Sequence, residues 1–223
     1  MPGSFLRHLL LRTGCLLALL PAVAGARDTL AEYGLDPVHT RVMFAISHAG
    51  FSRAIGTVSG STGTLAFDPG DWTRAKVDVR VPIVRVDLGD ADWNKATLAK
   101  SLLDAESHPE ARFVSTRVEP VDATHARVHG DLTLRGVTRE VVLDVVLNAA
   151  KRHPLPPFRR TVGFSATATL SRADFGITAW KSVIGDPVEL RIEAEATYDG
   201  KADDDVPSAD TPPSPPPPPE PTP

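Results

Sequence analysis

The chain has 223 residues, a formal net charge of −4 and a single cysteine, Cys15. Two arginines lie within residues 1–26, and one lysine and five acids lie within residues 201–223, so the part between them has a net charge of −2. This balance gives no electrostatic reason to expect nucleic acid or an anionic membrane surface as a partner.

Residues 1–26 have the pattern of a secretory signal peptide. Arg7 and Arg12 precede an apolar run from Cys15 to Leu20, and the segment ends at Ala26 in an A-x-A cleavage pattern. The apolar run is too short for a membrane span. We therefore predict cleavage after Ala26 and export of a mature chain without cysteine, which its own core must stabilise.

The domain predicted over residues 27–200 is all-β, because apolar and polar residues alternate through most of it. Residues 27–33 are expected to be a lead-in, followed by a turn at 35–40. A strand then covers Arg41–His48, and His48 closes its apolar face. Several glycines between residues 50 and 63 indicate bulges and bends, and alternation resumes from Ala75 to Ile83.

Residues 87–110 break the alternation and predict a single helix. Asp92 is expected to cap it, with the helix running over residues 93–103. Leu98 and Leu102 would form a narrow apolar stripe. Such a stripe must lie against the mouth or the side of the sheet.

The clearest hairpin lies between Arg127 and Leu147. Val128, Leu132 and Leu134 share one face, a turn follows at Gly136, and alternation then continues to Leu147. A strand precedes this hairpin at residues 112–118, and two more follow it at 161–170 and 186–196.

Residues 201–223 are acidic and rich in proline, and they predict a disordered tail with polyproline II character. A spacer or tether is one interpretation. The alternative is a ligand for a protein partner with a proline-binding groove.

The sequence contains none of the short motifs of metal, thiol or serine chemistry that we considered, such as HExxH, CxxC and G-x-S-x-G. His125 and His129 are four residues apart on one expected strand, roughly 13 Å from each other, which is too far for one metal ion. We therefore expect no metal site, no catalytic residues and no enzyme.

Eight or nine alternating strands without disulfides most easily satisfy one another as a closed antiparallel β-barrel, with one short helix near its mouth. A barrel of about eight strands is filled by side chains or holds one small ligand. The pattern leaves these two possibilities nearly even. Small residues on the inner faces, such as Ala166 and Ala168, favour a cavity.

Several motifs occur in a characteristic order between about Leu35 and Ala196. They are Asp36-Pro37-Val38-His39-Thr40, Leu98 with Ser101-Leu102-Leu103-Asp104-Ala105 and His108-Pro109, Gly130 to Thr138, Arg172 to Ile177, and Gly185-Asp186. Together they resemble the YceI-like family of exported polyisoprenoid-binding proteins. The resemblance implies a lipocalin-like barrel with a long apolar channel for an isoprenoid chain, export to the periplasm and, in many members, a homodimer.

The expected function is therefore to bind, and to carry or sequester, an isoprenoid lipid such as a quinone or a polyprenyl chain, with no other cofactor. Two alternatives remain: an enzyme acting on a lipid-like substrate with His48 as acid or base, and an interaction module that uses the proline-rich tail. Lys181 is a further polar candidate at the mouth. The expected ligand-binding residues are Phe44, Ile46, His48, Asp92, Asn94, Leu98, Leu102, Phe113, Leu132, Leu134, Phe164, Phe175 and Trp180.

Overall fold

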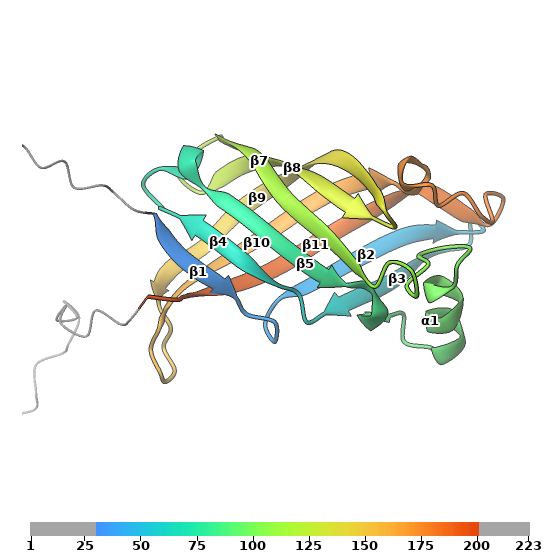
Figure 1. Ribbon diagram of the computed structural model, residues 1–223, viewed down its shortest axis with the longest axis horizontal. Coiled ribbons are helices and arrows are strands. Elements are labelled where there is room, and N and C mark those ends of the chain that lie inside the picture. The colour runs from blue at the N-terminus through green and yellow to red at the C-terminus, as the bar shows by residue number, and fades with distance from the viewer. Residues whose placement is uncertain (1–29, 201–223) are drawn as a thin grey trace, which may run out of the picture.

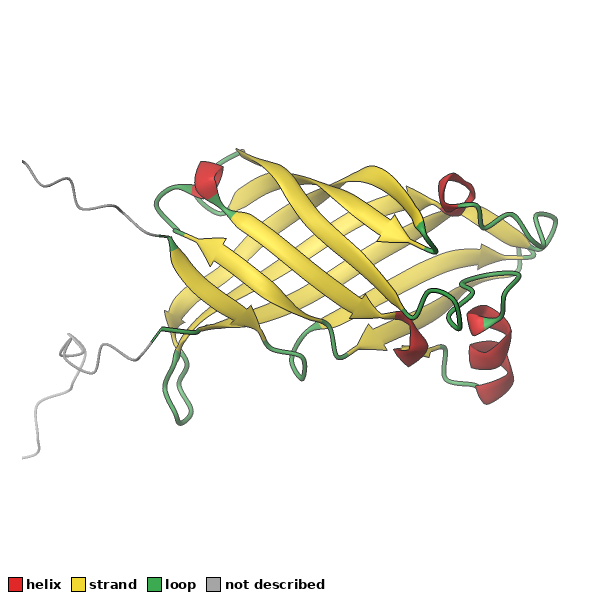
Figure 2. Ribbon diagram, viewed as in Figure 1, coloured by secondary structure: helices red, strands yellow, loops and turns green. Residues whose placement is uncertain are grey.

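The structure, a computed structural model, describes residues 30–200, which form an antiparallel β-barrel with one short α-helix (Figure 1, Figure 2). The predicted signal peptide and the predicted tail lie outside these residues. The elements are β1 (Ala31–Leu35), β2 (Arg41–His48), β3 (Ser52–Ser59), β4 (Thr62–Phe67), η1 (Trp72–Arg74), β5 (Lys76–Pro82), η2 (Ile83–Arg85), β6 (Val86–Asp87), α1 (Ala91–Leu98), β7 (Glu110–Pro120), β8 (His125–Leu134), β9 (Val137–Arg152), β10 (Arg160–Ser171), η3 (Arg172–Phe175) and β11 (Ile184–Tyr198).

The barrel is closed through its last strand. Eight strands form the ring β1-β4-β5-β7-β8-β9-β10-β11, and β11 returns to β1 through pairs such as Leu35 with Ala196. Further along its length β11 pairs with β2, which continues the sheet through β3 and β6. The expected closed barrel of about eight strands is confirmed.

A tight turn between β1 and β2 lets both strands lie along the same edge of β11. The Asp36 carboxylate accepts hydrogen bonds from the backbone N–H groups of Val38 and His39, and its other oxygen lies 2.8 Å from Nδ1 of His39. Buried Thr40 then bonds to the backbone of Glu195 on β11 through its hydroxyl group. The turn formed by the Asp-Pro-Val-His-Thr motif therefore places β2 next to β1 along the same edge of β11, so that the two strands pair with different parts of it.

The predicted alternation is correct on strands all around the barrel. Residues 75, 77, 79, 81 and 83 face the interior from β5 and its flanks, and residues 188, 190, 192, 194 and 196 do so from β11. On β9, Val141 is buried inside while its neighbour Val142 is exposed. The period of two thus indicated the inner face correctly.

Two predictions about elements are wrong. Residues 27–33 were expected to be a lead-in, but residues 31–35 form β1, because their partners on β4 and β11 lie far away in the sequence. The helix was expected at residues 93–103 with Asp92 as its cap, but it covers Ala91–Leu98. Its cap is Asp90, whose carboxylate accepts from the N–H groups of Asp92 and Trp93.

No helix within residues 30–200 is long and apolar enough to cross a membrane.

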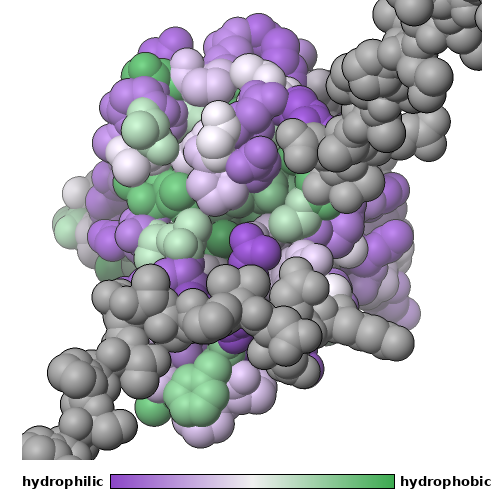
Figure 3. All heavy atoms as spheres, turned by 90° about the vertical axis from the view of Figure 1, so that its left-hand side faces the viewer, coloured by the Kyte–Doolittle hydropathy of each residue, from purple (hydrophilic) through white to green (hydrophobic). Residues whose placement is uncertain are grey.

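An aromatic cluster closes the end of the barrel where β1 begins and β11 ends. Trp72 on η1 is only 5% exposed and packs edge-to-face on Phe67 and Phe164, with ring centroids 5.1 and 6.2 Å away. Tyr33 and Val162, both almost fully buried, complete this floor. Figure 3 views the molecule from this closed end.

The turn at Asp36 predicts a pH-dependent contribution to stability. Burial raises the pKa of Asp36, but hydrogen bonds from His39 and Val38 outweigh it and hold this pKa below its ordinary value. The bond to Asp36 raises the pKa of His39. The Asp36 contribution is present above the unfolded pKa of about 3.9, and the His39 contribution is present below about 6.5, so both act together between these values.

In urea unfolding, the stability lost in Asp36→Asn should therefore be greatest between about pH 4 and 6.5. It should shrink as pH falls through the folded pKa of Asp36 or rises through that of His39. Asp68→Asn is the control, because Asp68 also accepts a backbone bond in an exposed turn but has no histidine partner. A loss that stays constant from pH 4 to 9, as roughly expected for a purely steric effect, would contradict the pairing.

Candidate functional site

The candidate site is a cavity of about 480 Å³ inside the barrel. It extends from the aromatic floor at Phe67 and Trp72 to the opposite end, where it reaches His48 and Trp93. The floor residues are buried, whereas Trp93 on α1 is 43% exposed. The α1 end is therefore the mouth of the cavity.

The interior is a cavity rather than a filled core. Phe44, Ile46, Leu132 and Leu134 all point inward, yet each is only partly buried. An inward side chain keeps accessible surface only if its neighbours leave space beside it. Of the two possibilities that the sequence left open, the structure has the cavity.

Two aromatic rings that line the cavity lie over glycines of neighbouring strands. A Cβ atom at Gly56 would lie 2.3 Å from the Phe44 ring, and one at Gly130 would lie 2.4 Å from the Phe113 ring. A larger residue at either position would push the ring inward and narrow the channel. Gly130 therefore makes room for the Phe113 ring.

Nine of the predicted ligand-binding residues lie together on the cavity wall. They come from β2, β7, β8, β10, η3 and the segment after α1. They are Phe44, Ile46, His48, Leu102, Phe113, Leu132, Leu134, Phe164 and Phe175.

Four predicted ligand-binding residues do not line the cavity. Asp92 is exposed on α1, and Trp180 is 65% exposed. Asn94 ties α1 to the sheet, because its side chain donates to Asp87 and accepts from the N–H of Leu88. Leu98 packs against the cluster of Ile83, Ala105 and Ala111 and does not line the cavity. The polar candidate Lys181 is also exposed and outside the lining.

Three polar side chains in the cavity wall are paired with the backbone, whereas the Ser61 hydroxyl and the Trp72 indole N–H have no hydrogen-bond partner within the described residues. The Ser115 hydroxyl accepts from the N–H of Val77, and Thr40 bonds to β11 as described above. Arg172 is only 5% exposed and donates to the carbonyl oxygens of Ile177, Ile184 and Gly185 at 2.8–2.9 Å. Since these groups are already paired, the wall offers a guest mainly apolar contact.

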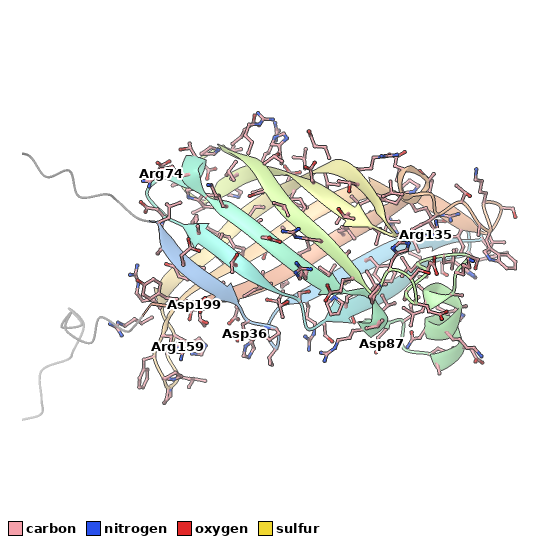
Figure 4. The ribbon with its side chains drawn as sticks, viewed as in Figure 1. Asp36, Arg74, Asp87, Arg135, Arg159 and Asp199 are labelled. Atoms are coloured by element: carbon pink, nitrogen blue, oxygen red, sulfur yellow. The ribbon has the colours of Figure 1, made fainter. Side chains whose placement is uncertain are left out.

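The scattered sequence motifs meet at the mouth. Arg135 on the β8–β9 turn donates to the carbonyls of Gly176 and Lys100 (Figure 4). Gly136 in that turn has φ +74°, and a Cβ there would lie 2.7 Å from the His108 ring. The motifs at 98–109, 130–138 and 172–177 therefore lie together around the mouth of the cavity.

The last two motifs contact each other in the same way. Besides the bond from Arg172 to Gly185, the N–H of Ala173 donates to Asp186. Hydrogen bonds from the Ser171 hydroxyl and from Ala173 lower the pKa of Asp186. The pKa of Asp87 is likewise lowered, chiefly by the side chain of Asn94. These two carboxylates therefore hold the segments around the mouth in place.

Sequence reasoning missed several residues of the site. Trp93 and Leu103 line the mouth, but neither lies in an alternating strand, so no periodic signal marked them. Trp72 follows a turn motif, and nothing in that motif predicted that its side chain is buried at the closed end of the barrel. Arg172 was part of a recognised motif, but nothing in its neighbours indicated that the charge is buried.

The described residues give no support to a metal site. Within residues 30–200 no group of three or more His, Cys, Asp or Glu side chains could hold a metal ion. His48 contacts the Trp93 ring at a centroid distance of 5.5 Å. In this part of the chain its ring has no hydrogen bond or ion pair.

The chain is similar to known proteins over nearly all of the described part. The YceI-like domain model matches residues 33–196. A UPF0312 protein of Pseudomonas syringae pv. tomato is 34% identical over 187 residues, covering 82% of this chain and 94% of the relative.

Two solved structures share the fold. One is BcnA of Burkholderia cenocepacia, with a TM-score of 0.65 and 24% identity, covering 73% of this chain and 99% of the other. The other is a polyisoprenoid binding domain from Saccharophagus degradans, with a TM-score of 0.57 and 16% identity, covering 76% and 99%.

Arg172→Lys should destabilise the protein by roughly 2–4 kcal/mol in urea unfolding, because an ammonium group cannot reach three carbonyl oxygens in the geometry of the guanidinium fork. The matched control is Arg139→Lys, since Arg139 is exposed and donates only to the neighbouring Thr138 carbonyl. Its effect should stay within about 0.5 kcal/mol. Equal stabilities of the two variants would show that the hydrogen bonds of Arg172 do not stabilise the loops around the mouth.

Proposed function

The chain belongs to the YceI-like domain family, and from this premise we propose that it binds an isoprenoid lipid in its barrel cavity. The lipid is a quinone or a polyprenyl chain, which the protein carries or sequesters in the periplasm. The observation that carries the proposal is the cavity itself, which is apolar, closed at one end and open at the other.

The size and lining of the cavity fit a chain-like apolar guest. Its volume of about 480 Å³ lies within the roughly 300–1,000 Å³ that is usual for small-molecule sites. Aliphatic and aromatic side chains line it from floor to mouth, and polar side chains of the wall such as Ser115 and Arg172 are paired with backbone. A polar or charged substrate would lose its hydration inside and gain few partners in return.

Burial of hydrocarbon is sufficient to drive such binding. Each buried CH₂ contributes about 0.8 kcal/mol, so one five-carbon isoprene unit contributes roughly 4 kcal/mol. Association costs about 4–15 kcal/mol in lost freedom. A few buried units therefore give binding without a strong polar contact, and a head group at the mouth needs only to select the ligand.

The comparisons support the same class of ligand. The Saccharophagus degradans neighbour is described as a polyisoprenoid binding domain, and it shares the barrel fold with this chain. The enzyme alternative depended on His48, and a general base is normally oriented by a second polar group. Within residues 30–200 no such partner bonds to the His48 ring. These contacts favour binding over catalysis.

Native mass spectrometry of the protein purified from the periplasm of an expressing bacterium tests the proposal. We expect a stoichiometric adduct that organic extraction identifies as a quinone or polyprenyl lipid. A bare protein mass that remains unchanged after incubation with quinones and polyprenyl phosphates would contradict it. Loss of the adduct on extraction, with recovery after re-addition of the lipid, separates specific binding from contamination.

A second test fills the cavity without burying a charge. Ala166 is buried on the inner face of β10, so Ala166→Phe should occlude the channel and reduce retained lipid by roughly tenfold or more. Its neighbour Thr167 is exposed, and Thr167→Phe places the same ring outside the barrel. Lipid content should be unchanged in that control. Equal lipid content in two folded variants would place the ligand elsewhere.

A further inference from the structure

Three large aromatic side chains at the mouth end of the barrel are exposed. Phe51 is 93% exposed, Trp180 is 65% exposed and Trp93 is 43% exposed. They come from the β2–β3 turn, the loop before β11 and helix α1, which lie at the same end of the barrel (Figure 1). We call these three residues the aromatic rim.

Backbone hydrogen bonds and a ring contact link all three to the segment at His48. The N–H of Phe51 donates to the carbonyl of His48, and the Trp93 ring lies 5.5 Å from the His48 ring. Next to His48, the N–H of Ala49 donates to Val183, whose own N–H donates to the carbonyl of Trp180. The rim is therefore one surface, and it adjoins the lining of the cavity at His48 and Trp93.

The backbone at the rim is shaped to present these side chains. Ala49 and Gly50 both have positive φ angles, at 50° and 75°, which makes the tight turn that projects Phe51. Trp180 itself has φ 58°, a conformation that is uncommon for a bulky residue. Single exposed apolar residues are ordinary on protein surfaces, but a cluster at the opening of an apolar cavity marks an interaction site.

From this arrangement we infer that the aromatic rim docks on the surface of a lipid bilayer, so that the cavity opens directly into the membrane. This inference rests on the proposed function, because a lipid ligand must leave a membrane to reach the cavity. If the lipid passes through water between the membrane and the cavity, exposure of each of its methylene groups to water costs free energy. A mouth seated in the bilayer removes that exposure.

The chemistry of the rim fits this partner. Tryptophan and phenylalanine favour the boundary between lipid head groups and acyl chains. The charged residues nearby are of both signs. Arg53 forms an ion pair with Glu189. Asp92 and Asp186 lie close in the sequence to Lys95 and Lys181 and balance their charge. Binding therefore depends on insertion of aromatic rings and only weakly on salt or on anionic lipid.

The opposite end of the barrel supplies a matched control. The β9–β10 hairpin, at the lower edge of Figure 3, exposes Leu155 and Phe158 and carries the basic residues Lys151, Arg159 and Arg160. It presents apolar side chains of similar size, but at the closed end. If the protein used this hairpin to dock, the mouth would face away from the membrane.

The test uses the exported protein, with its N-terminus verified by mass, and vesicles of phosphatidylcholine with a minor share of phosphatidylglycerol and no isoprenoid. The rim variant is Phe51→Ser with Trp93→Ser and Trp180→Ser, and the control is Leu155→Ser with Phe158→Ser. We expect the rim variant to co-sediment with vesicles roughly tenfold less than the wild type and the control to be unchanged. Matching thermal unfolding curves exclude misfolding as the cause.

Tryptophan fluorescence gives an independent readout in case the triple variant does not fold. Brominated phosphatidylcholine should quench wild-type emission, whereas Trp93→Phe with Trp180→Phe leaves only Trp72 among the described tryptophans, buried at the floor, and should abolish quenching. No binding by the wild type, or loss only in the control, would overturn the inference. So would a dimer that the rim variant dissociates without any vesicle binding.

The outcomes separate this inference from the proposed function. The vesicles contain no isoprenoid, so their binding does not depend on the ligand. A protein that retains an isoprenoid but ignores vesicles refutes membrane docking alone. A protein that binds vesicles through its rim but never holds an isoprenoid refutes the proposed ligand alone.

Discussion

The hydrogen bonds of strand β11 are the constraint on which the rest of the structure depends. A sheet edge exposes unpaired backbone groups, and β11 removes such edges by pairing with β10 on one side and with both β1 and β2 on the other. Within the ring of eight strands the backbone groups are paired along the wall, and side chains fill or line the interior. The closed ring therefore determines both the stability of the chain and the existence of an inner space.

The interior then depends on how its polar groups are handled. Thr40, Ser115 and Arg172 are placed where carbonyl or N–H groups need partners, so their polarity strengthens the wall and does not reach the cavity. At one end aromatic rings fill the barrel, and at the other end hydrogen bonds from Arg135 and Arg172 fix the loops around the opening. One chain thus builds a floor and a mouth by two different kinds of interaction.

Sequence periodicity predicted most of the wall, because each inward residue of a strand repeats at a spacing of two. It could not predict β1, whose identity as a strand comes from partners on two other strands, Phe67 on β4 and Ala196 on β11 among them. Nor could it place Trp93 or Trp72, which lie in a helix and a single turn where no alternation exists. Asn94 shows the converse: a polar residue near a mouth suggested a ligand contact, but its amide is used to tether α1.

The buried floor made by Phe67, Trp72 and Phe164 has a consequence for any linear guest. A tube open at both ends would accept a chain of any length by letting it pass through. A tube with a floor acts as a ruler: the first units fill it, and every further unit remains outside, whatever the total length of the chain. The position of these three rings therefore sets how much of such a molecule the barrel can hold.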